Sequence, residues 1–255
     1  MNSRILVTGL LLTAWSTATS ASQDITLAAA ANLTDVLFQI QDDAQKAVGV
    51  QIFVNLGLSG TLRRQIEEGA PVDVFFSAAH EDMEALAKEG LIIPGSRRDF
   101  LRDSLVMIGE PGMKPAAGPQ EVRYLLKSAH AIAICNPDSM PAGRYAVEAL
   151  KKYGMYDSAK TRLALGGSFR EVLQLVQNRS VPLGLVFLTD ALSAQRSGSI
   201  VRIFRFPAET FSEPIVYPVA VTTASRNKSK AEKLIEFLQG DVARGVFEKA
   251  GFEVP

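Results

Sequence analysis

Short apolar runs typical of β-strands alternate with amphipathic helical segments along almost the whole chain, and this order limits the folds that it can adopt. The strand-like runs are found at residues 24–30, 50–57, 72–78, 104–109, 129–135, 183–188 and 215–223. Helical spacing of apolar residues covers about residues 34–48, 61–68, 81–89, 142–153 and 168–178, with two more helices around Gly240 in residues 228–252. Strands that alternate with helices predict an α/β fold with largely parallel strands buried on both faces.

The length of 255 residues allows either one large domain or two smaller ones. A Pro- and Gly-rich stretch, "EPGMKPAAGP" at residues 110–119, interrupts the pattern before it resumes. No extended polar linker follows it. Two α/β lobes joined by strands therefore fit the pattern better than one large sheet.

The first 21 residues have the three parts of a secretory signal peptide. Arg4 supplies a weak positive charge, residues 5–15 form an apolar region, and Thr19, Ser20 and Ala21 form a small-residue cleavage site. The apolar region is too short for a transmembrane helix, which needs about 20 residues. We predict export with cleavage after Ala21, and the absence of cysteine at this site argues against a lipid anchor there.

The charges and the single cysteine exclude several kinds of partner and of bond. Basic and acidic residues number 27 each, so no basic field recruits nucleic acid or anionic lipid. Cys135 cannot form an intramolecular disulfide, and its place in the apolar run "AIAIC" predicts a small buried hydrophobic side chain. A small-molecule partner is the better expectation.

Four strand-to-helix joints carry small or hydroxyl residues. They are "AAANLT", "LGLSGTL", "NPDSMPAG" and "GGSFRE", beginning at residues 29, 56, 136 and 166. Taken singly, Asn32, Ser59 and Ser168 are typical helix N-cap residues. Taken together, the joints predict helix N-termini around a crevice at the carboxyl ends of strands, where free N–H groups bind anions without Lys or Arg.

Several longer motifs resemble the periplasmic molybdate-binding proteins that feed ABC transporters. The matching stretches are "LAAAANLTDVL", "LSGTLRRQIEEGAPVDVFFSA", "NPDSMPAGRYAVEAL", "PLGLVFLTDA", "YPVAV" and "FEKAGF". The resemblance implies a type II periplasmic-binding-protein fold, in which two α/β lobes are joined by crossing strands and close on a tetrahedral oxyanion. Lobe I would comprise residues 22–104 plus 218–255, and lobe II residues 105–217.

Carried over by motif, the oxyanion-binding positions of the family fall on Asn32, Ser59, Ala142, Phe169 and Phe187. The same five residues would hold the metal, which is bound only as molybdate. Ser59 would give its hydroxyl and backbone N–H, and Ala142 and Phe169 would each give a backbone N–H. No catalytic residue and no cofactor is expected, apart from the ligand molybdate or tungstate.

Two of these positions depart from the family pattern. Asn32 stands where many members have Ser, and Phe187 stands where many have a Tyr whose hydroxyl touches the oxyanion. We hypothesise that the amide of Asn32 offsets the donor that is missing at Phe187. The alanines before Asn32 would let the backbone pack tightly beneath the ligand.

Neutral donors suit an oxyanion that carries no proton, whereas protonated phosphate would need an acceptor. Sulfate and chromate remain alternative ligands, because only the size of the cavity distinguishes sulfate from molybdate. The resemblance therefore implies a periplasmic solute-binding protein that captures molybdate, and also tungstate, and delivers it to an ABC permease in the inner membrane. We expect a monomer that binds no nucleic acid and is not an enzyme.

Two rival functions have weaker support. A secreted hydrolase would need the motif G-x-S-x-G, which "GLSGT" fails at its last position. His80 looks like a solvated helix-start residue, and His130 lies in an apolar run, which favours a structural role. A cation-binding protein could use Asp73, Asp138 and Asp190, but the few histidines and the one cysteine are widely spread.

Overall fold

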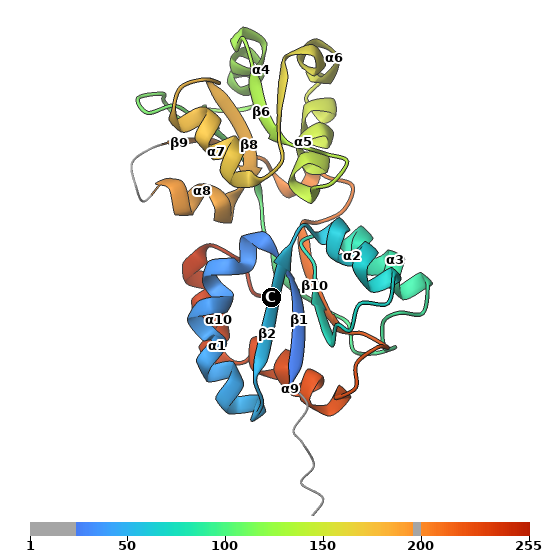
Figure 1. The fold of residues 1–255 in the computed structure, drawn as a ribbon. Coiled ribbons are helices and arrows are strands. Elements are labelled where there is room, and N and C mark those ends of the chain that lie inside the picture. Colours follow the sequence, from blue (N-terminus) through green and yellow to red (C-terminus); the bar gives the residue numbers. More distant parts are fainter. Residues whose placement is uncertain (1–23, 196–199) are drawn as a thin grey trace, which may run out of the picture.

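The computed structural model describes residues 24–195 and 200–255, which form two lobes with a five-stranded sheet in each (Figure 1). The predicted signal peptide, residues 1–21, lies outside the described residues. No helix in the described ranges combines the length and the apolar character needed to cross a bilayer. The two-lobed α/β architecture predicted from the sequence is confirmed.

The first sheet has the strand order β2-β1-β3-β10-β4. β1 pairs in parallel with β2 and with β3, whereas β10 pairs antiparallel with β3 and with β4. Its strands are β1 (Ile25–Ala30), β2 (Ile52–Gly57), β3 (Val74–Phe76), β4 (Arg98–Arg102) and β10 (Val216–Val221).

The second sheet repeats this arrangement with the order β7-β6-β8-β5-β9. β6 pairs in parallel with β7 and with β8, and β5 pairs antiparallel with β8 and with β9. Its strands are β5 (Leu105–Gly109), β6 (Ile132–Cys135), β7 (Leu163–Gly166), β8 (Leu183–Phe187) and β9 (Val201–Arg205).

The sheets are mixed, although the sequence predicted largely parallel strands. The reversed strands, β5 and β10, are the two that follow a passage of the chain from one lobe to the other. The parallel strands end at the cleft between the lobes, whereas a strand that arrives from the other lobe begins there. Its direction is therefore opposite to that of its neighbours, and no pattern within the strand reports this.

The two crossing connections lie side by side, and the first has only two residues. Asp103 and Ser104 join β4 to β5, and residues 206–215 join β9 to β10. The Asp103 N–H donates to the Ile215 carbonyl at 3.0 Å, and the Leu188 N–H donates to the Ser104 carbonyl at 2.8 Å. The lobe boundaries given above fall in or beside these connections and stay a prediction.

Helices cover both faces of each sheet (Figure 1). In the first lobe they are α1 (Thr34–Val48), α2 (Ser59–Glu67), α3 (His80–Lys88), α9 (Lys228–Gln239) and α10 (Asp241–Ala250), with the 3-10 turn η1 (Ala31–Leu33). In the second lobe they are α4 (Pro119–Ser128), α5 (Pro141–Lys152), α6 (Tyr156–Ala159), α7 (Phe169–Gln177) and α8 (Leu188–Gln195), and the 3-10 turns η2 (Lys160–Arg162) and η3 (Ala208–Thr210) follow.

Alternation along the strands of the first lobe separates two apolar cores. Ile25, Leu27 and Phe76 belong to the core that α1, α9 and α10 cover, and this core continues through the crossing connections into the second lobe. Ala28 and Phe75 face the opposite way, into the smaller core beneath α2 and α3. Because successive strand residues point to opposite faces, the position of each residue in its strand decides which core it joins.

The predicted helix at residues 34–48 is confirmed as α1, which ends at Gly49 in the left-handed conformation with φ 75°. Glycine pays no steric penalty there, which makes it a common helix stop. The prediction for residues 61–68 began too late, because α2 starts at Ser59. This difference places Ser59 within the first turn of the helix.

Candidate functional site

The five residues singled out in the sequence line one small cavity between the lobes. We call it the inner cavity, and its volume is about 30 Å³. Its lining comes from both lobes and consists of Ala30, Ala31, Asn32, Gly57, Leu58, Ser59, Ala78, Met140, Pro141, Ala142, Phe169, Phe187 and Asp190. The fold thus brings together six segments that are separated in the sequence.

The run of alanines forms the floor of this cavity. Ala28, Ala29 and Ala30 are buried in β1, the strand that pairs with both β2 and β3. Ala30 and Ala31 line the inner cavity directly. Small side chains at this strand end leave room for a ligand close to the backbone.

Ser59 presents its hydroxyl to the cavity from the first residue of α2. It is 2 % exposed, and its Oγ accepts a hydrogen bond from the Ala78 N–H at 3.0 Å. The hydroxyl proton is therefore left to donate to a ligand. The interpretation of Ser59 as a helix cap was wrong, because Leu58 is the N-cap residue and no side chain caps α2.

Two more helices begin at the cavity. Ala142 is the second residue of α5 and Phe169 is the first of α7. Backbone N–H groups in the first turn of a helix have no acceptor within the helix, so both remain able to bind an anion. Ser168 is a true cap of α7, because its Oγ accepts from the Glu171 N–H at 3.2 Å.

A glycine allows α5 to approach the end of β6. A Cβ atom at Gly143 would lie 2.2 Å from the Cys135 carbonyl oxygen and 2.7 Å from the Pro137 nitrogen. No side chain fits in that space, so only glycine permits this contact. The close approach holds the first turn of α5, with Ala142, at the cavity.

Asn32 is the cavity end of a hydrogen-bonded chain that reaches the crossing connection. Its Nδ2 donates to the Tyr217 Oη at 2.5 Å, and Tyr217 donates to the Asp103 Oδ2 at 3.4 Å. The Thr189 hydroxyl donates to the same Asp103 oxygen at 2.7 Å. Asn32 does not cap α1, because the N-cap residue of that helix is Leu33. The interpretation of Asn32 as a helix cap was therefore also wrong.

Phe187 closes the cavity from the end of β8 with an apolar ring. The ring is 2 % exposed and its centroid lies 6.1 Å from that of Tyr145 and 6.2 Å from that of Tyr217. These contacts hold the ring within the apolar core. The side chain of Phe187 supplies no hydrogen-bond donor to the cavity.

Sequence reasoning named Asp190 only as a possible cation ligand, whereas it lines the inner cavity and is 5 % exposed. Burial raises the pKa of its carboxyl well above the ordinary value, the Asp103 carboxyl raises it further, and the Arg170 guanidinium opposes both. Asp103 escaped notice, and burial raises its pKa to about 7. A signal for Asp190 existed, since it follows Phe187 by three residues at the start of a helix.

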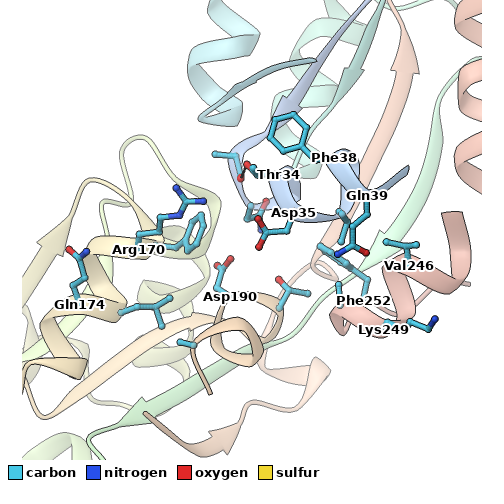
Figure 2. Close-up of a pocket in the computed structure, with 18 of the residues that line it drawn as sticks. Thr34, Asp35, Phe38, Gln39, Arg170, Gln174, Asp190, Val246, Lys249 and Phe252 are labelled. Carbon is cyan, nitrogen blue, oxygen red and sulfur yellow. Dashed lines mark hydrogen bonds between the residues drawn. The ribbon is translucent and has the colours of Figure 1, made fainter. Parts of the chain in front are cut away.

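A larger opening, which we call the outer cleft, adjoins the inner cavity and has a volume of about 1040 Å³. It lies between α1 and α10 of the first lobe and α7 and α8 of the second (Figure 2). Asn32, Phe169 and Asp190 line both spaces. Figure 2 shows Asp35 on one side of the outer cleft and Arg170 and Asp190 on the other.

The residues named for a hydrolase do not meet at the cavity. His80 begins α3 and lies 2.8 Å from the Arg97 guanidinium, and His130 is exposed instead of structural. Neither histidine lines the inner cavity or the outer cleft. Ser59 therefore has no histidine partner that could act as its base.

The three aspartates named for a cation are likewise separated. The Asp73 carboxylate accepts from the Thr26 N–H at 2.8 Å and from the Ser225 hydroxyl at 2.7 Å, and Asp138 is exposed. Within the described residues, no three metal-ligating side chains come together. Cys135 is buried, and burial raises its pKa, which confirms the expected small hydrophobic role.

Comparisons with known proteins agree with this geometry. A sequence model of the family described as bacterial extracellular solute-binding protein matches residues 25–253. The chain is 32 % identical to the molybdate-binding protein ModA of Haemophilus influenzae over 251 residues, which cover 96 % of each chain. It is also 32 % identical to ModA of Escherichia coli over 238 residues, covering 90 % of this chain and 89 % of the relative.

A solved structure gives the same picture. The periplasmic molybdate-binding protein of Azotobacter vinelandii superposes with a TM-score of 0.76 and 28 % identity. The match covers 91 % of this chain and 99 % of that one. Both sheets and the cleft between them thus have counterparts in a known fold.

Proposed function

Because the chain belongs to the bacterial extracellular solute-binding proteins, we propose that it captures molybdate and delivers it to the permease of an ABC transporter. The relatives named as molybdate-binding proteins, which match over most of the chain, support this ligand. Tungstate has the same charge and tetrahedral shape, so it is the second expected ligand.

One observation carries the proposal. Three helices, α2, α5 and α7, begin at a single cavity that both lobes line. Each N-terminus carries about half a positive charge and unpaired N–H groups, so together they favour a dianion without any cationic side chain.

The proposed contacts follow from the placement of the donors. Ser59 gives its hydroxyl and its N–H, and Ala142 and Phe169 each give a backbone N–H. Asn32 has a second amide N–H beyond the one that bonds Tyr217. Phe187 shapes the cavity and gives no donor from its side chain.

The alternatives have less support. Sulfate and chromate share the shape and charge of molybdate, so the size of the closed cavity must discriminate between them. A secreted hydrolase would need a base beside Ser59, and neither histidine reaches the cavity. We therefore expect no catalysis and no cofactor.

The setting of the protein completes the proposal. A family of extracellular proteins implies export, and we propose that residues 1–21 are the cleaved signal and that the mature protein acts in the periplasm. The formal net charge of zero gives no reason to expect nucleic acid as a partner. We expect a monomer that docks on an inner-membrane permease.

Titration calorimetry on the mature chain tests the ligand. Molybdate, tungstate, chromate and sulfate are titrated separately, and we expect molybdate and tungstate to bind at least tenfold more tightly than sulfate. The only tryptophan, Trp15, leaves with the signal, so calorimetry is preferable to tryptophan fluorescence. Tighter binding of sulfate, or no binding of any of the four, would refute the proposal.

A further inference from the structure

Asp190 is the one ionisable side chain among the described residues that line the inner cavity. It belongs to the first turn of α8, directly after the strand that ends in Phe187. The other polar contributions to the lining come from Asn32, Ser59 and backbone groups. A carboxyl group in this position has to be reconciled with a doubly negative ligand.

Two protonation states of the Asp190 carboxyl are compatible with a bound oxyanion, and each suits a different kind of anion. An ionised carboxylate only accepts hydrogen bonds, so beside a fully deprotonated oxyanion it would leave two acceptors and two like charges in contact. A neutral carboxyl has one O–H and can donate it to an oxyanion oxygen. An ionised carboxylate would instead suit an oxyanion that brings its own proton, such as hydrogen phosphate.

The surroundings of Asp190 decide between these protonation states. Its side chain is buried, and burial raises its pKa well above the ordinary value because the charged form loses water. The nearby Asp103 carboxyl acts in the same direction, and Arg170 acts against it. The N-terminus of α8 also favours the ionised form, so burial and Asp103 act against Arg170 and this helix end.

Four charged or titratable groups interact electrostatically with Asp190: Asp103 of the β4–β5 connection, Tyr217 of β10, Arg170 of α7 and Cys135 of β6. Asp35 of α1 and Lys249 of α10 line the outer cleft that Asp190 also lines. Burial also raises the pKa of Cys135 and of Tyr217, so these two groups are neutral at physiological pH.

We infer that Asp190 is a specificity-determining residue of the oxyanion site, where its neutral carboxyl donates an O–H hydrogen bond to the bound anion. This inference rests on the proposed function, because it needs an oxyanion in the inner cavity. It also supplies a donor from the β8–α8 segment, where the side chain of Phe187 has none. A fully deprotonated oxyanion accepts this bond with any of its oxygens, whereas an anion that carries a proton also needs an acceptor for its own O–H.

Two substitutions of Asp190 distinguish a hydrogen-bond donor from a side chain that only occupies space. Asp190→Asn has nearly the same shape and keeps an N–H donor at every pH, so molybdate should bind within about threefold of wild type at pH 6. Asp190→Ala loses the donor, and the affinity for molybdate should fall by roughly tenfold to a hundredfold. Asp157→Asn is the matched control, because the Asp157 side chain is 92 % exposed and distant from the cleft lining.

The pH dependence of the affinity for molybdate is a second measurement, which a change in packing alone would not alter. In wild type and in the Asp157→Asn control, the affinity for molybdate should fall as pH rises from 6 to 9, by up to about tenfold per pH unit once Asp190 ionises. Titrations in buffers of different ionisation enthalpy should then show proton uptake on binding. Asp190→Asn should flatten the profile and abolish the uptake.

Inorganic phosphate provides the selectivity test. Wild type should bind phosphate at least a hundredfold more weakly than molybdate at pH 6, where the Asp190 carboxyl is neutral and phosphate carries protons. A pH-independent affinity in wild type, equal binding by Asp190→Asn and Asp190→Ala, or tighter binding of phosphate than of molybdate would each overturn the inference while leaving oxyanion binding intact. If wild type binds no oxyanion at all, the proposed function and this inference both fall.

Discussion

The lobes meet differently on the two sides of the cleft. On the side that we call the contact side, Arg144 of α5 places its Nη2 3.7 Å from carboxylate oxygens of both Glu81 and Asp82 on α3. On the open side, Asp35 of α1 and Arg170 of α7 line the same outer cleft of about 1040 Å³ (Figure 2). No ion pair joins these two described residues.

On the contact side the lobes attract each other through opposite charges that form no hydrogen bond. A separation of 3.7 Å is too long for a hydrogen bond, and the Asp82 Oδ2 is buried without a hydrogen-bond partner among the described residues. Burial raises the pKa of Asp82, while Arg144 and Arg63 lower it. The lobes therefore meet on the contact side through two ion pairs without hydrogen bonds, and closure over a ligand would narrow the outer cleft.

The largest expected effect is on the pH dependence of stability. It arises from Asp103, which lies in the crossing connection between β4 and β5. Its pKa is raised to about 7 from 3.8, so the folded state binds the proton more tightly than the unfolded chain does. The stabilisation is complete below about pH 4 and is lost as pH rises through 7. We expect the free energy of unfolding to fall by about 3 kcal/mol between pH 5 and pH 8.

Thermal and urea unfolding at these two pH values measures this change. Asp103→Asn imitates the protonated carboxyl, so the pH dependence should shrink and the variant should gain on wild type at pH 8. The buried carboxyl of Asp190 acts in the same direction and should leave a remainder. A wild-type stability that rises from pH 5 to pH 8 would contradict the assignment.

The next largest effect is expected for Ser59→Ala in the inner cavity. A hydrogen bond to a charged partner contributes about 1.5–3 kcal/mol, so the Kd for molybdate should rise by roughly tenfold to a hundredfold. Ser128→Ala, at an exposed site in α4, is the control. If Ser59→Ala melts earlier than wild type but binds molybdate equally well, the hydroxyl serves only the Ala78 N–H.

A smaller effect tests the open side. If closure brings Asp35 to Arg170, then Asp35→Ala and Arg170→Ala should each weaken molybdate binding by about twofold to fivefold, as for an exposed ion pair. A double-mutant cycle should show coupling that decreases with added salt. Purely additive effects would mean that the two charges do not meet in the bound protein.

The smallest effect is expected for Arg144→Ala on the contact side. The Arg144 side chain is one-third exposed (33 %), so its pairs should contribute less than about 1 kcal/mol to stability. We expect molybdate affinity within about threefold of wild type and a slightly larger radius of gyration for the free protein by small-angle scattering. A tenfold loss of affinity, without recovery in Arg144→Lys, would show that this contact directs closure.

The sequence by itself determined the local elements and the candidate donors. The residues of α1 follow from an apolar stripe at helical spacing and a terminal glycine, and both signals act within a few residues of each other. The motifs around Ser59, Ala142 and Phe169 identified three helix starts, which the fold places at one cavity. These inferences succeeded because the causes are close in sequence to their effects.

Only the tertiary structure decided the direction of β5 and β10, the partner of Asn32 and the environment of Asp190. Asn32 bonds Tyr217, which lies 185 positions away in the sequence. Asp190 reads as an ordinary acidic residue in the first turn of a helix, yet both lobes surround it and remove its water. Desolvation depends on every group that packs around a side chain, so the protonation of a carboxyl is a property of the folded molecule and not of its neighbours in the sequence.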